Sequence, residues 1–102
     1  MVLLEFSIFP LDKGESLSPY VARCLDIVDR SGLAYRCHAM GTILEGELDD
    51  VLGVVKKCFD ALAADCARIE CSIKLDYRSG RRDGLDAKVR AVEERLGRKL
   101  KR

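Results

Sequence analysis

Two glycines frame a short β-prone run that carries the most chemically suggestive side chains of this chain. The run is Met40-Gly41-Thr42-Ile43-Leu44-Glu45-Gly46-Glu47. Because glycine tolerates positive φ and a close backbone approach, Gly41 and Gly46 could aim Thr42 and Glu45 into a pocket. Turn chemistry explains the same run without any ligand, as the tip of a hairpin followed by the acidic start of a helix. Both interpretations are open at this point.

The sequence contains no recognisable catalytic apparatus. Glu45 or His38, the only histidine, offers a general base, but no nucleophile, base and orienting group stand in a legible pattern. The glycines do not form the Gly-x-x-x-x-Gly-Lys pattern of a phosphate-binding loop. We therefore expect a protein that is not an enzyme.

The cysteines do not form a metal-binding pattern. Their number is odd and no Cys-x-x-Cys pair occurs, whereas a structural zinc site needs four ligands in paired spacing. Most of them fall at apolar positions, where cysteine behaves as a small buried hydrophobe. We expect no metal, and five free thiols in a reducing compartment, at Cys24, Cys37, Cys58, Cys66 and Cys71.

The length and hydropathy of the chain limit its class. The 102 residues predict one domain, 1–102, with one modest core. No stretch approaches the ~20 continuous apolar residues that span a bilayer, so no membrane association is expected. The N-terminus lacks a basic leader followed by a long apolar run, and we expect a cytoplasmic protein.

Charge is spread unevenly along the chain. Residues 1–80 carry a net charge of −4 and residues 81–102 a net charge of +5. A basic terminal segment is more often the solvated face of a helix than a nucleic-acid site. The acidic body also opposes phosphate binding, so we expect no nucleic-acid partner.

Hydrophobic periodicity predicts four strands and three helices. The strands are expected at 1–9, 34–40, 42–47 and 67–78. The first helix is expected to begin with Ser18 as its N-cap and to end at Ser31-Gly32-Leu33. The second begins with Asp49 or a neighbour as its cap and is complete by residue 65. The last carries an apolar stripe of Leu85, Val89, Val92, Leu96 and Leu100.

This order of elements, β-α-β-β-α-β with a terminal helix, predicts an α+β fold of the ferredoxin-like class with a four-stranded antiparallel sheet. In the last strand, alternation predicts one buried face, made of Ile69, Cys71, Ile73, Leu75 and Tyr77. The sheet face opposite the helices has no chain left to cover it and is expected to meet another subunit. That face holds Glu5, Ser7, Ser72 and Lys74.

An ordered set of short segments resembles the thiamine-binding-protein family, which is related to the YkoF-like proteins. The segments are Ser16-Leu17-Ser18-Pro19-Tyr20-Val21-Ala22, Ser31-Gly32-Leu33-x-Tyr35, the run Met40–Glu47, Lys74-Leu75-Asp76-x-Arg78 and Lys88-Val89. The resemblance covers essentially the whole chain. It implies a ferredoxin-like subunit that pairs with its own copies as a homodimer or homotetramer. It also implies binding of thiamine or its hydroxymethylpyrimidine part, without catalysis and without a further cofactor.

A thiamine site needs an apolar or aromatic slot, a carboxylate and a few neutral hydrogen-bond partners. Under this resemblance Glu45 holds the pyrimidine, Thr42 and Ser7 fix ring edges, and Met40 forms a soft wall. Tyr20, Tyr35 or Phe9 is the candidate stacking ring, and His38 is a further candidate. Glu45 has an alternative role as the partner of Lys74 or of an arginine from another subunit. The alternative function is a structural or regulatory homo-oligomer that binds no thiamine.

Overall fold

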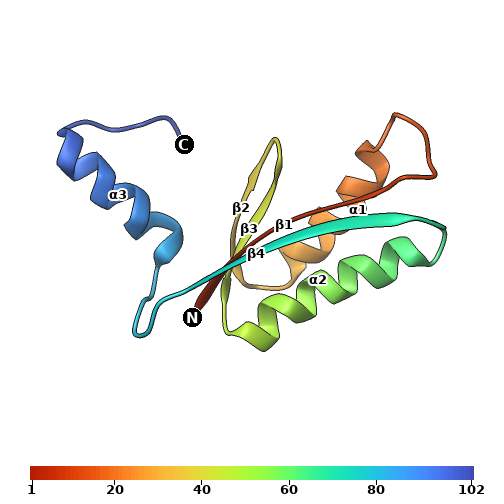
Figure 1. Ribbon diagram of the computed structural model, residues 1–102, viewed down its shortest axis with the longest axis horizontal. Coiled ribbons are helices and arrows are strands. Elements are labelled where there is room, and N and C mark those ends of the chain that lie inside the picture. The colour runs from red at the N-terminus through yellow and green to blue at the C-terminus, as the bar shows by residue number, and fades with distance from the viewer.

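The computed structural model describes residues 1–102 and confirms the ferredoxin-like fold (Figure 1). The elements are β1 (Val2–Pro10), α1 (Ser18–Arg30), β2 (Ala34–His38), β3 (Gly41–Gly46), α2 (Leu48–Ala63), β4 (Ile69–Tyr77) and α3 (Gly84–Leu96). The strands form one antiparallel sheet in the order β2-β3-β1-β4. Helices α1 and α2 lie side by side on one face of that sheet. None of the helices is both long and apolar enough to cross a bilayer.

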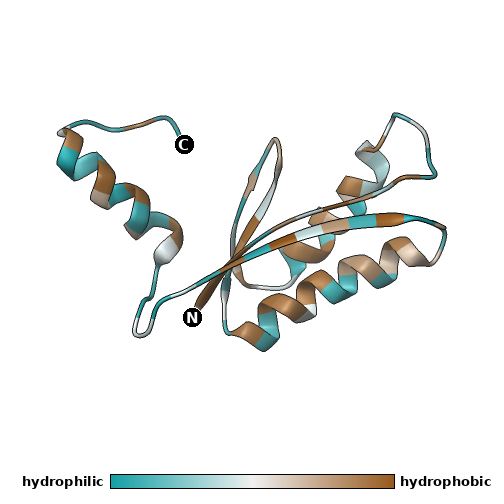
Figure 2. Ribbon diagram, in the orientation of Figure 1, coloured by the Kyte–Doolittle hydropathy of each residue, from teal (hydrophilic) through white to brown (hydrophobic).

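The core lies between this sheet face and the two helices. Alternation in β1 turns Val2, Leu4, Phe6 and Ile8 towards the helices, and all four are buried. The buried residues of the helices are Cys24 and Val28 of α1 and Val51, Val54, Val55, Cys58 and Leu62 of α2. Figure 2 shows hydrophobic and hydrophilic residues interspersed along α1 and α2, as expected for amphipathic helices that bury one side.

The predicted end of α1 is confirmed, whereas the N-caps of α1 and α2 are other residues than those predicted. Gly32 has a φ of +78° after α1, as predicted for a left-handed helix stop, and the Leu33 amide donates to Ser31 Oγ. Ser18 is not the N-cap of α1. The cap is Leu17, whose carbonyl accepts from the amides of the first turn, and no side chain caps it. Glu47 caps α2 in place of Asp49, again without a side-chain hydrogen bond.

The β2–β3 hairpin turns at Ala39 and Met40, not at Gly41. Gly41 opens β3, opposite His38. A Cβ atom at Gly41 would lie 2.8 Å from the carbonyl oxygen of Phe6, a distance that side chains do not tolerate. Glycine at this position therefore lets the hairpin close tightly onto β1.

The apolar side of β4 is not buried in the subunit, contrary to the sequence prediction. Ile73, Leu75 and Tyr77 face the helix side of the sheet but are 46–68% exposed. The physical reason is that β4 is the edge strand, while the helices pack mainly over β1 and β3. On α2 the hydrophobic residues Leu52 and Phe59 are also exposed.

Candidate functional site

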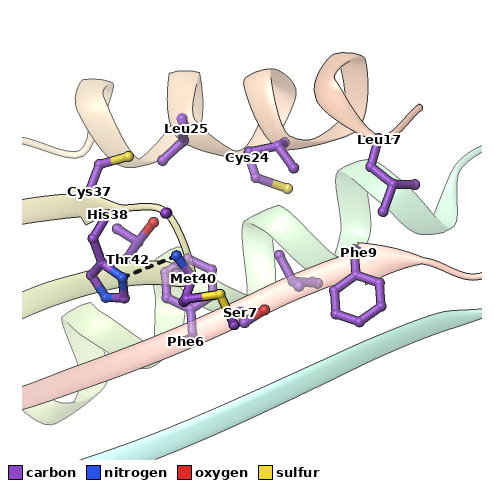
Figure 3. A pocket seen from close by; sticks show the side chains of 14 residues that line it. Phe6, Ser7, Phe9, Leu17, Cys24, Leu25, Cys37, His38, Met40 and Thr42 are labelled. Atoms are coloured by element: carbon purple, nitrogen blue, oxygen red, sulfur yellow. Dashed lines mark hydrogen bonds between the residues drawn. The ribbon is translucent and has the colours of Figure 1, made fainter. Parts of the chain in front are cut away.

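A cavity of about 220 Å³ lies between the N-terminal half of α1, the strand β1 and the tip of the β2–β3 hairpin (Figure 3). Ten of its fourteen lining residues are hydrophobic. The helix contributes Leu17, Val21, Cys24 and Leu25, the strand contributes Phe6, Ser7, Ile8 and Phe9, and the hairpin contributes Cys37, His38, Ala39, Met40, Gly41 and Thr42. It is thus a largely apolar slot with polar groups at one end.

The cavity exists because β1 is longer than β3. Pairing with β3 ends at Phe6, opposite Thr42, whereas pairing with β4 continues to Pro10. Beyond Phe6 the β3 side of β1 is therefore open. Backbone groups of successive residues point to opposite sides of a strand, so those of every second residue point to the same side, and the carbonyl of Phe6 faces Gly41. By this alternation the N–H and C=O of Ile8 point into the opening.

The hairpin tip is held by His38. Its Nδ1 accepts from the amide of Met40 at 3.2 Å, as the dashed line in Figure 3 shows, and its Nε2 lies 3.3 Å from a carboxylate oxygen of Glu5. Met40 is 82% exposed and lies at the mouth of the cavity, while Thr42 is buried in its wall. His38 therefore orders the turn that closes one end of the slot.

A second hollow of about 320 Å³ adjoins the first on the sheet face opposite α1 and α2. Contrary to the sequence prediction, part of this face is covered by the same chain, because the N-terminus of α3 lies over Glu45 and Leu3. The two hollows share Phe6, Ser7, His38 and Met40. The second hollow adds polar side chains, namely Glu5, Ser72 and Lys74. An elongated ligand can thus place an apolar ring in the first hollow and a charged part beside the carboxylate of Glu5.

The structure brings four of the six predicted site residues together at the cavity, which are Ser7, His38, Met40 and Thr42. Tyr20 does not line it. Its ring packs against the core, and the guanidinium carbon of Arg23 lies 5.4 Å from the ring centroid.

Glu45 also lies away from the cavity, on the opposite face of the sheet from Thr42. The two residues are three apart in a strand, so their side chains point to opposite faces. Glu45 is buried and accepts from the amides of Gly84 at 2.5 Å and Leu85 at 3.5 Å. Its carboxylate thus holds the N-terminus of α3, where the helix dipole favours a negative charge. Neither Lys74 nor any other lysine or arginine of the subunit pairs with it.

A charged cluster on β4 fixes the same helix from the other side. Asp76 accepts from Lys88 of α3 at 2.7 Å and from Arg81 at 2.8 Å. These two hydrogen bonds, that of Lys88 first, lower the pKa of Asp76 to about 2. Arg81 is only 11% exposed in its side chain and also donates to the backbone carbonyl of Asp76. Arg81 reaches Asp76 because the turn at Gly80 folds the chain back along the strand.

The sequence analysis missed the helix side of the cavity. Val21, Cys24 and Leu25 lie at helical spacing in α1, and such an apolar stripe is typical of a core-facing helix side. Val28, at the far end of that stripe, is fully buried, whereas Val21 is 40% exposed and lines the cavity. One signal in the sequence could have indicated this. The apolar stripe of α1 is long enough to extend past the end of β3, so its first residues have no strand of the hairpin to pack against.

The chain matches the family model described as thiamine-binding protein over residues 4–93. A UPF0045 family protein of Methanocaldococcus jannaschii is 36% identical over 93 residues, which cover 91% of this chain and 93% of that protein. A UPF0045 family protein of Mycobacterium tuberculosis is 38% identical, with 93% and 94% of the two chains covered.

Solved structures agree with these sequence matches. The crystal structure of the M. jannaschii protein aligns with a TM-score of 0.84 over 91% of this chain and 96% of that one, at 35% identity. A Thermotoga maritima protein, for which a role in thiamine biosynthesis or salvage has been suggested, aligns with a TM-score of 0.78 over 89% and 97% of the chains. Its 21% identity supports the fold alone. From the match over residues 4–93 and from its close relatives, the chain belongs to the thiamine-binding protein family.

Proposed function

We propose that this protein binds thiamine, or its hydroxymethylpyrimidine part, in the cavity at the hairpin tip and does not transform it. The observation that carries the proposal is the apolar slot whose polar groups gather at one end, in a chain of the thiamine-binding protein family. Such a slot is the usual form of a site for a flat heteroaromatic ligand.

The size of the cavity favours one ring over two. Its volume of about 220 Å³ lies below the roughly 300–1,000 Å³ of pockets for drug-sized ligands. In the proposed complex the aminopyrimidine enters the slot between Phe6 and Leu25. The hydroxyl of Thr42 and the free backbone groups of Ile8 are the hydrogen-bond partners available to the ring edge.

The cationic thiazolium ring of thiamine then lies outside the slot, over Met40 and His38. Methionine is a soft and adaptable contact surface for such a ring. The carboxylate of Glu5 in the adjoining hollow supplies the negative charge that the sequence analysis assigned to Glu45. Thiamine should therefore depend on Glu5, and hydroxymethylpyrimidine, which lacks the thiazolium, should not.

The acid–base groups of the cavity support binding without catalysis. His38 is the one imidazole or carboxyl side chain in the lining, and both of its nitrogens already face partners within the hairpin region. A general base needs a free nitrogen within hydrogen-bond reach of the proton that it removes. In the proposed complex His38 holds the hairpin turn in place and removes no proton from the ligand.

Calorimetric titration with thiamine and with hydroxymethylpyrimidine tests this proposal. Val21→Trp places a large ring in the slot and should weaken binding of both ligands by at least about tenfold, which corresponds to 1.4 kcal/mol. Glu5→Gln should weaken thiamine binding and leave hydroxymethylpyrimidine binding unchanged. Glu45→Gln should leave both affinities unchanged, because Glu45 lines neither hollow and its carboxylate accepts from the amides at the N-terminus of α3.

Leu52→Trp, at an exposed position of α2, is the matched control for the added ring. Wild-type protein that releases no heat at millimolar ligand would remove the proposed function. Wild-type affinity in Val21→Trp would keep the ligand but move it out of this cavity.

We also propose that the subunit works as a homo-oligomer through the exposed side of β4. The free edge of this nine-residue strand offers unpaired backbone groups. Ile73 and Leu75 next to that edge are apolar and about half exposed. A second copy that pairs along β4 covers both the unpaired backbone groups and the apolar side chains. The opposite face around Ser72 is polar and does not require such cover.

Light scattering of Leu75→Arg and Ser72→Arg distinguishes these two faces of β4. Leu75→Arg is expected to shift the wild-type oligomer towards monomer at micromolar concentration, because an arginine cannot be buried unpaired. Ser72→Arg, on the polar face, should leave the assembly intact. A monomeric wild-type protein contradicts the proposal, and dissociation by Ser72→Arg alone moves the interface to the polar face.

A further inference from the structure

Two buried thiols meet where α1 crosses α2. The thiol of Cys58 donates to the carbonyl oxygen of Cys24 at 3.6 Å, and the sulfur of Cys24 lies 4.0 Å from the carbonyl oxygen of Cys58. Each sulfur therefore touches the backbone of the residue that carries the other. A disulfide needs the two Cα atoms within about 4.4–6.8 Å, and this mutual contact brings the backbones of the two helices together at these two residues.

The two thiols differ in access. Cys24 is one of the residues that line the cavity, and its side chain is drawn there in Figure 3. Cys58 does not line the cavity and has no exposed surface. A small polar molecule of the size of one or two waters fits in about 220 Å³ and reaches Cys24 first.

We propose that Cys24 and Cys58 form a peroxide-sensitive thiol pair, in which a peroxide in the cavity oxidises Cys24 and Cys58 then closes an intramolecular disulfide between α1 and α2. The inference needs the cavity but not the proposed thiamine ligand. It assigns a chemical role to Cys58, which lies outside the cavity, and to the thiol of Cys24, which donates no hydrogen bond in the proposed ligand complex.

The steps balance without any further reactant. The Cys24 thiolate attacks one oxygen of hydrogen peroxide, so that an S–O bond forms, the O–O bond breaks and hydroxide leaves. The sulfur of Cys58 next attacks the Cys24 sulfenic acid; an S–S bond forms, the S–O bond breaks, and water leaves with the Cys58 proton. Overall, two thiols lose two electrons and one peroxide becomes two waters.

The surroundings of the pair fit this division of roles. The adjacent side chain of Cys58 lowers the pKa of Cys24, and the nearby Arg23 acts in the same direction against the effect of burial. The adjacent side chain of Cys24, with burial, raises the pKa of Cys58. The more acidic thiol, which is the more reactive one towards peroxide, is thus the one that lines the cavity.

Peptide mapping of the folded wild-type protein after hydrogen peroxide tests the proposal. Trypsin releases Cys24 on residues 24–30 and Cys58 on residues 58–68, and the non-reduced digest should contain these two peptides joined, lighter by two hydrogens. Because Cys66 lies on the same peptide as Cys58, the Cys66→Ser variant should give the same crosslink. Dithiothreitol should reverse it.

Two variants check the order of the steps. In Cys58→Ser, dimedone should trap a sulfenic acid at Cys24 at least roughly tenfold more than in wild type, where the second thiol consumes it. Cys24→Ser should give no crosslink and no dimedone adduct at Cys58.

A crosslink that joins Cys58 to Cys71, oxidation confined to the exposed Cys37 and Cys71, or the Cys24–Cys58 crosslink appearing only in denaturant would each overturn the proposal. The mapping is done on wild-type protein, so it remains decisive if a variant does not fold.

Discussion

Leu44→Ala is expected to lower the free energy of unfolding by about 2–5 kcal/mol, the range for removing a large buried aliphatic side chain. Leu44 has no exposed surface and lies opposite Leu4 at the centre of the sheet face that α1 and α2 cover. Its removal leaves a cavity that four elements cannot close by small shifts, because each is fixed by its own backbone hydrogen bonds. Urea unfolding at one fixed protein concentration measures the loss.

Leu48→Ala is the matched control for this substitution, since Leu48 is 45% exposed at the start of α2. We expect its effect to stay within about 1 kcal/mol. If both substitutions cost the same free energy, Leu44 is not at the centre of the core.

Glu45→Ala is expected to release α3 while leaving the rest of the subunit folded. The amides of Gly84 and Leu85 lose the carboxylate that accepts from them. A hydrogen bond to a charged group contributes about 1.5–3 kcal/mol, so amide exchange in α3 should accelerate by roughly ten- to a hundredfold. Hydrogen exchange followed over residues 84–96 measures this opening.

Glu70→Ala removes an exposed carboxylate from β4 and serves as the control. Exchange in β1 and β3 should be the same in wild type and in both variants, because α3 contributes little to the core between the sheet and α1 and α2. Unchanged exchange of α3 in Glu45→Ala would mean that Asp76, through Arg81 and Lys88, holds the helix without Glu45.

The fold was predictable because local patterns determine most of it. Alternation in β1, helical spacing in α1 and α2, and the glycine stop at Gly32 each identify an element without tertiary information. Exposure of Ile73 and Leu75 was not predictable in the same way. Alternation shows that one face of a strand is apolar, but not whether a helix of the same subunit reaches that face.

The candidate site was predicted in part for a similar reason. Ser7, His38 and Thr42 come together because the hairpin register places them at one end of the sheet. Glu45 was assigned to the ligand because its type suits a cation, but strand periodicity already places it opposite to Thr42. The role it has instead depends on α3, whose return to β3 follows from no local pattern in the sequence.

The central place of β1 in the sheet has a consequence for how the chain folds. β1 pairs over its whole length with β4, the last strand to be synthesised, while the hairpin and both helices form from nearby residues. Much of the native structure therefore consists of contacts between distant parts of the chain, and high contact order slows folding. Until β4 leaves the ribosome, one edge of β1 remains unpaired beside its apolar side chains, which is the state in which a nascent chain aggregates or recruits a chaperone.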